Sequence, residues 1–174
     1  MRPESEYAEP DSMPYEHNGD DLVFPHALPV SAKDVRDKLA SYPWMDSLTL
    51  AFALRGAREL SLGTGEATDL LSISLSTTDA IGHAYGPDSR EMHDHLLRLD
   101  KWLGIFLDSL ATMVPANRIV LALTSDHGVT SFPEYLTTVK HVSAGRISLD
   151  GVGRALSTTP VSYTHLTLPT NREV

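Results

Sequence analysis

The sequence predicts an α/β protein whose centre is a βαβ unit. Two short apolar runs, at residues 70–76 and 119–123, have the composition of strands. A long amphipathic helix is expected between them, over residues 88–111. The order strand, helix, strand predicts a crossover that leaves the two strands parallel in one sheet. Their carboxyl ends then lie at the same edge, which is where open α/β sheets bind ligands.

Composition narrows the class of protein further. The 174 residues and their 41% hydrophobic content suffice for one domain with a core. The formal net charge of -9 argues against nucleic acid or an anionic membrane surface as a partner. There is no cysteine, which excludes disulfides, thiolate metal sites and a cysteine nucleophile. No apolar run approaches the ~20 residues of a membrane helix, and the first residues lack the apolar core of a signal peptide.

Three regions differ in composition. Residues 1–30 are rich in proline and acidic residues, which predicts an extended loop region on the surface. Residues 31–160 are expected to form the α/β domain, with short helices near 132–136 and 150–156. Residues 161–174 fit neither region and resemble translated adapter sequence, so we exclude them from fold reasoning.

Two helices are expected before the first strand. Ser31 and Asp34 form a capping pattern that predicts a short helix from Ser31 onwards. A second helix is expected over residues 46–61, where apolar residues recur at helical spacing. Asp46 or Ser47 is its predicted N-cap, because these residue types accept hydrogen bonds from the first helical amides.

The predicted βαβ unit contains both motifs of interest. Residues 70–76 alternate apolar and small polar side chains, and a glycine-containing loop is expected over 77–87. In the helix that follows, apolar residues recur every three or four positions and are expected to be buried. They are Met92, Leu96, Leu99, Leu103, Phe106 and Leu110. Residues 119–123 are apolar throughout, as expected of a strand covered on both faces.

Each predicted strand is followed by one aspartate and one histidine. Asp79 and His83 are four residues apart, and Gly82 would let the loop turn so that both face one ion. Asp126 and His127 are adjacent, so their side chains diverge and can serve two ions. Carboxylate and imidazole together suit zinc or manganese. The alternative is ordinary turn or helix-cap chemistry, which a single such motif would not exclude.

Small and hydroxyl side chains flank these four candidates. A threonine or serine hydroxyl at the sheet edge could act as a nucleophile, but we expect supporting roles for those present. The hydroxyl residues are Thr77, Thr78, Thr124 and Ser125. Support of the metal ligands or shaping of their loops is predicted for Thr78, Gly82, Gly86, Ser125 and Gly128.

The motifs resemble those of a known enzyme family. The matching residues are Asp79, Gly82, His83, Gly86, Pro87 and Ser89, then Arg98, Leu99 and Asp100, then Thr124 to Gly128. This combination resembles the type I phosphodiesterase/nucleotide pyrophosphatase group of the alkaline phosphatase superfamily, which includes the PafA-like alkaline phosphatases. The resemblance covers most of residues 14–155. It implies part of an alkaline-phosphatase-like sheet with flanking helices.

The resemblance also implies a chemistry. Asp79 and His83 would bind one zinc ion, and Asp126 and His127 a second, with manganese or magnesium as the less favoured metals. A threonine or serine nucleophile would form a covalent phospho-enzyme that is then hydrolysed. In the family the nucleophile and one aspartate ligand come from further upstream, and one histidine ligand from further downstream. This sequence matches none of the three, so it is expected to be an internal fragment that has no catalytic nucleophile and is inactive alone.

Several readings of function stay open. Small-molecule phosphate monoesters are the favoured substrates, and nucleotide pyrophosphatase or phosphodiesterase activity is the alternative within the family. A sulfatase would need a formylglycine motif, which is absent, and Gly86, Pro87 and Ser89 argue against a phosphopentomutase or phosphoglycerate mutase. A non-catalytic module that retains the fold is a further alternative, distinguished by its metal content. The resemblance favours a periplasmic or secreted enzyme.

Overall fold

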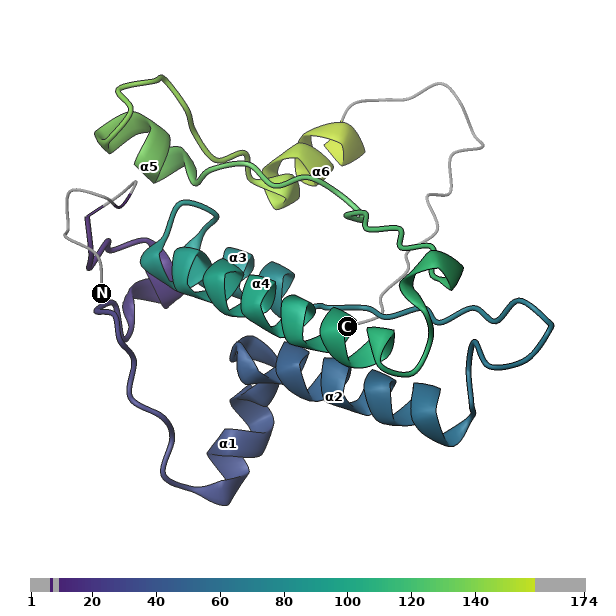
Figure 1. The fold of residues 1–174 in the computed structure, drawn as a ribbon. Coiled ribbons are helices and arrows are strands. Elements are labelled where there is room, and N and C mark those ends of the chain that lie inside the picture. The colour runs from purple at the N-terminus through teal and green to yellow at the C-terminus, as the bar shows by residue number, and fades with distance from the viewer. Residues whose placement is uncertain (1–6, 8–9, 159–174) are drawn as a thin grey trace.

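The computed structural model describes residue 7 and residues 10–158. Within these residues the chain forms six α-helices and three short 3-10 helices, joined by extended segments (Figure 1). The α-helices are α1 (Ala32–Lys38), α2 (Trp44–Glu59), α3 (Thr77–Tyr85), α4 (Arg90–Ala111), α5 (Pro133–Thr138) and α6 (Leu149–Thr158). The 3-10 helices are η2 (Glu16–Gly19), η3 (Leu39–Ser41) and η4 (Ala116–Arg118).

Helix α4 is the element against which α2 and α3 pack (Figure 1). Asp46 at the start of α2 lies beside His95, and Gly63 after α2 lies beside Val114 after α4, so α2 and α4 run in the same direction. Helix α3 runs the opposite way. The buried apolar side chains come mainly from these helices and are Leu50, Ala57, Ile81, Met92, Phe106, Val114 and Tyr135.

A local capping signal predicted the start of α1 correctly, and α4 begins within two residues of its expected start. The Ser31 hydroxyl oxygen accepts a hydrogen bond from the Asp34 amide at 3.0 Å, as the capping pattern predicted. Ser89 is the N-cap of α4 and accepts from the Met92 amide at 3.2 Å. The apolar stripe of α4 is only partly buried, because Leu96 is 49% exposed while its neighbour His95 is fully buried.

The predicted N-cap of the second helix is wrong. Helix α2 begins at Trp44, with Pro43 in the N-cap position, so Asp46 lies inside the first turn. Its carboxylate turns inward and accepts hydrogen bonds from Thr77 at the start of α3. A side-chain partner 31 residues away therefore replaced the local capping role that the sequence predicted for Asp46.

The predicted loop over residues 77–87 is also wrong for most of its length. Residues Thr77–Tyr85 form helix α3, and only Gly86 and the residues after it form the turn into α4. Gly82 lies inside the helix, where a Cβ atom would meet the Met92 side chain at 3.4 Å. Gly82 lies inside a helix that contacts α4, so it does not turn a loop between Asp79 and His83 as we predicted.

The predicted sheet stays a prediction. No strand pairing is present in the part of the chain that the structure describes, and residues 70–76 and 119–123 belong to neither a helix nor a strand. Their apolar side chains are largely open, with Leu70 90% and Val120 96% exposed. A pair of strands is only marginally stable unless further strands or helices cover it. The apolar composition of these two segments predicts such covering neighbours, and the described residues do not provide them.

The described part of the N-terminal region lies against α3. The ring of Tyr85 stacks with His17 at 5.3 Å and with His26 at 4.8 Å between centroids. Glu16 of η2 is buried, so this region is not solely a surface loop. The predicted adapter-derived tail, residues 161–174, lies outside the described residues. None of the described helices combines the length and apolar character needed to cross a membrane.

Candidate metal centre

The first motif lies on one face of α3. Residues four apart on a helix are neighbours, so Asp79 and His83 project together. The Asp79 Oδ1 atom is 3.4 Å from His83 Nε2, and both side chains are largely exposed. The helix therefore does what a glycine-containing loop was predicted to do, since it presents a carboxylate and an imidazole to the same point in solvent.

The second motif lies in the extended segment that follows α4. Asp126 Oδ1 accepts a hydrogen bond from the His127 amide at 3.0 Å, and Asp126 Oδ2 lies 3.6 Å from His127 Nε2. The Nδ1 atom of His127 lies 3.0 Å from the Gly128 carbonyl oxygen, so Nδ1–H donates to it. This tautomer leaves the Nε2 lone pair free to bind a metal ion. The hydrogen bond to Gly128, aided by the charge of Asp126, raises the pKa of His127.

The two motifs meet at Asp79. His127 Nε2 lies 3.7 Å from Asp79 Oδ1, the oxygen atom that also faces His83. The sequence predicted this convergence at a sheet edge, whereas the described structure has it between a helix face and an extended segment. None of the described His, Asp and Glu residues form a group of three or more arranged to hold a metal ion. The donor types nevertheless suit zinc, because they offer carboxylate oxygen and imidazole nitrogen.

Contacts around the turn after α3 bring the second motif to the first. Gly86 has a φ of +91°, and a Cβ atom there would lie 3.1 Å from the ring of Phe132. The chain runs from η4 back towards this turn, where Phe132 precedes α5 (Figure 1). A side chain at residue 86 would force the ring to move away by a few tenths of an ångström. Gly86 thus allows the two motif segments to lie close together.

Hydroxyl groups beside the motifs are engaged in hydrogen bonds. Thr77 donates to Asp46, and the Thr78 hydroxyl lies 2.9 Å from His95 Nε2. The Thr124 hydroxyl donates to the Ser125 carbonyl oxygen at 3.0 Å. The contacts of Thr77 and Thr124 support structural roles for these two hydroxyl groups.

Sequence reasoning missed two buried polar residues behind the first motif. Asp46 was predicted only as a local cap, and no role was predicted for His95. Both are almost completely inaccessible to solvent. Nothing in the sequence pairs them, because their contact depends on how α2, α3 and α4 pack together.

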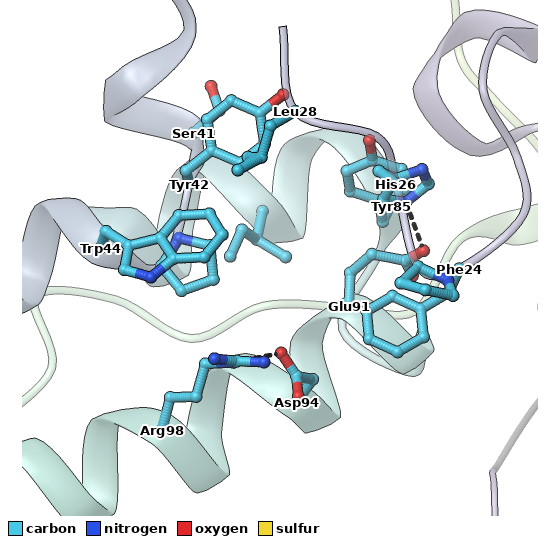
Figure 2. Close-up of a pocket in the computed structure, with 13 residues that line it drawn as sticks. Phe24, His26, Leu28, Ser41, Tyr42, Trp44, Tyr85, Glu91, Asp94 and Arg98 are labelled. Atoms are coloured by element: carbon cyan, nitrogen blue, oxygen red, sulfur yellow. Dashed lines mark hydrogen bonds and ion pairs between the residues drawn. The ribbon is translucent and has the colours of Figure 1, made fainter. Parts of the chain in front are cut away.

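A pocket lies on another side of α3. Figure 2 shows aromatic side chains around it, together with the His26–Glu91 and Arg98–Asp94 pairs. Helix α3 contributes Ile81 and Tyr85 to its wall. Successive helix residues are ~100° apart, so Ile81 points about 160° away from the candidate ligands at positions 79 and 83. The pocket is therefore separate from the candidate metal centre.

Comparison with known proteins identifies the family. The family model described as type I phosphodiesterase / nucleotide pyrophosphatase matches residues 3–151, and the chain belongs to this family. Alkaline phosphatase PhoV of Synechococcus elongatus is 39% identical over 129 residues, which are 72% of this chain and 24% of PhoV. Alkaline phosphatase PhoK of a Sphingomonas species is 40% identical over 92 residues, or 53% of this chain and 16% of PhoK.

A solved structure of the same kind confirms the likeness in three dimensions. The crystal structure of wild-type alkaline phosphatase PafA superposes with a TM-score of 0.77 at 26% identity. The match covers 90% of this chain and 31% of PafA. The chain thus spans less than a third of the length of each of these relatives. The predicted resemblance to the alkaline phosphatase superfamily is confirmed.

Proposed function

We propose that the chain carries the central part of a metal-dependent phosphate-ester hydrolase, with phosphate monoesters as its substrates. Asp79 and His83 would hold one zinc ion, and Asp126 and His127 a second. The observation that carries the proposal is the meeting of both motifs at one atom, with Asp79 Oδ1 at 3.4 Å from His83 Nε2 and 3.7 Å from His127 Nε2. Bound zinc would supply Lewis-acid stabilisation of the charge on phosphoryl oxygens.

The residues of this chain would position the metal ions and leave the nucleophile to the rest of the enzyme. The Gly128 carbonyl holds His127 in the tautomer that frees Nε2, and helix α3 holds Asp79 and His83 at a fixed spacing. Thr77 is buried and bonded to Asp46, which argues against it as the attacking hydroxyl. The names of PhoV and PhoK favour monoesters, and the family description keeps the nucleotide pyrophosphatase or phosphodiesterase as the alternative. A periplasmic or secreted location fits the same family.

Zinc affinity tests the site directly. The metal-free chain is titrated with Zn²⁺ in competition with a chromophoric chelator, alongside Asp79→Asn and His127→Gln. We expect both substitutions to weaken zinc binding, because each removes a ligand from the point where the motifs meet. Asp37→Asn is the matched control, since Asp37 is an exposed helical carboxylate that pairs with Lys33 four residues away. Equal zinc affinity in all four proteins would contradict the proposed metal centre.

Turnover tests the division of roles. The chain with zinc should hydrolyse an aryl phosphate no faster than its His83→Ala variant, because it has no nucleophile of its own. Zinc-dependent hydrolysis clearly above that of the variant would show that the chain itself supplies the attacking group. In that case a hydroxyl group near the motifs would have to be reassigned to catalysis.

A further inference from the structure

Four polar side chains from three helices meet behind the first turn of α3. The Thr77 hydroxyl donates to Asp46 Oδ1 at 2.9 Å, and the Thr77 amide lies 3.4 Å from the same oxygen. The Thr78 hydroxyl lies 2.9 Å from His95 Nε2, and Asp46 Oδ2 lies 3.7 Å from that nitrogen. Asp46 and Thr77 are each 1% exposed, and His95 is 0% exposed.

Buried polar groups of this kind disfavour folding unless they are hydrogen-bonded. Asp46 Oδ2 and His95 Nδ1 have no hydrogen-bond partner among the described residues, so the cluster is only partly satisfied. Desolvation lowers the pKa of His95, against the effect of the Asp46 charge, and this favours the neutral ring. The arrangement is thus poorly suited to stability alone, which points to a further role for its geometry.

The cluster replaces a missing helix cap. Ser76 occupies the N-cap position of α3 but makes no side-chain hydrogen bond to its first amides. The Asp46 carboxylate reaches across from α2 and accepts from the amide and hydroxyl of Thr77 instead. A negative charge at this end of a helix also interacts favourably with the helix dipole.

The cluster is not a nucleophilic triad, although it contains an aspartate, a histidine and a threonine. In such a triad the carboxylate and the hydroxyl bind opposite nitrogens of the imidazole. Here Asp46 and Thr78 approach the same Nε2 atom of His95, and the ring is closed to solvent. No substrate can reach the His95 ring. The role that remains for the cluster is to position other residues.

We infer that Asp46 and His95 are positioning residues for the candidate metal centre, acting through Thr77 and Thr78 on the first turn of α3. Those two threonines immediately precede Asp79, so holding them from two sides fixes the point at which the Asp79 carboxylate leaves the helix. His83 lies one helical turn further along and is oriented by the same anchor. This inference rests on the proposed metal centre and adds the residues that hold it in place.

The test removes the anchoring hydroxyl groups and leaves the candidate ligands intact. Thr77→Val and Thr78→Val replace each threonine with a side chain of nearly the same shape, whereas Thr77→Ser and Thr78→Ser retain the hydroxyl. Zinc affinity is measured as above, together with thermal unfolding by circular dichroism. We expect the valine variants to bind zinc roughly tenfold more weakly, as is common when a group that supports a ligand is lost. The serine variants should stay within about threefold of the unsubstituted chain, since the hydrogen bonds are kept.

The outcomes separate this inference from the proposed function. A merely structural cluster would lower the unfolding temperature of the valine variants without weakening zinc binding in the folded chain, and that result would overturn the positioning role. Thr78 is only partly buried, so Thr78→Val keeps the test usable if Thr77→Val does not fold. If the unsubstituted chain binds zinc no better than Asp79→Asn, the metal centre itself is wrong, and the positioning role is overturned with it.

Discussion

Replacing Gly86 with alanine should destabilise the chain and loosen the contact between the two motifs. Gly86 has φ +91° and ψ 162°, a backbone region that is nearly restricted to glycine. Placing alanine there costs about 1–3 kcal/mol. The new Cβ atom would also lie 3.1 Å from two ring atoms of Phe132, and relieving such overpacking costs about 1–3 kcal/mol more. The free energy of unfolding should therefore fall by at least about 2 kcal/mol.

Urea unfolding followed by circular dichroism at 222 nm measures this loss. Gly104→Ala is the matched control, because Gly104 lies within α4 and a Cβ atom there meets no other atom within 4 Å. Alanine has a higher helix propensity than glycine, so the Gly104→Ala control should be about 1 kcal/mol more stable than the unsubstituted chain. A Gly86→Ala variant as stable as the unsubstituted chain would show that neither the positive-φ turn at residue 86 nor its contact with Phe132 is present in solution.

Two further substitutions test the helix cap and the unpaired segments. Ser89→Ala should lower the free energy of unfolding by about 1–2 kcal/mol, because the hydroxyl caps α4 and also donates to the Gly86 carbonyl oxygen at 2.9 Å. Ser109→Ala, on the same helix, should change it by less than about 0.5 kcal/mol, and an equal loss at both sites would contradict the capping role. Val120→Thr should have an effect below about 0.5 kcal/mol, because Val120 is 96% exposed. The same change at buried Val114 should cost about 1–3 kcal/mol, and a similar loss at Val120 would reveal a covered strand that the described structure lacks. Urea unfolding measures all four variants.

Local signals carried most of what the sequence predicted correctly. Ser31 caps α1 through a hydrogen bond to a residue three positions away, so the pattern and the structure lie within one short segment. The prediction that Asp79 and His83 face the same point was also correct, although the predicted secondary structure around them was wrong. We predicted a loop from its glycines, but a helix also brings residues four apart to one face.

The features that were missed depend on contacts between distant segments. Asp46 meets Thr77 across 31 residues, and His95 meets Thr78 from a third helix, so no local pattern marks either of them. The predicted sheet depends on distant contacts even more strongly. The backbone of a strand finds its hydrogen-bonding partners only in another strand. The apolar composition of residues 119–123 predicts that both faces of this segment are covered, but it does not identify the covering elements.

The two motifs differ in how firmly they are held, and this difference bears on the proposed site. Asp79 and His83 lie on a helix that is anchored at its first turn by buried side chains of α2 and α4. Asp126 and His127 lie in an extended segment, where the described hydrogen bonds to these two residues come from adjacent residues. A metal ion that binds first to Asp79 and His83 would therefore meet two ligands that are already held in place. Binding first to Asp126 and His127 would carry the additional entropic cost of ordering the backbone of the extended segment. The first motif is for this reason the part of the site at which single substitutions should weaken zinc binding most.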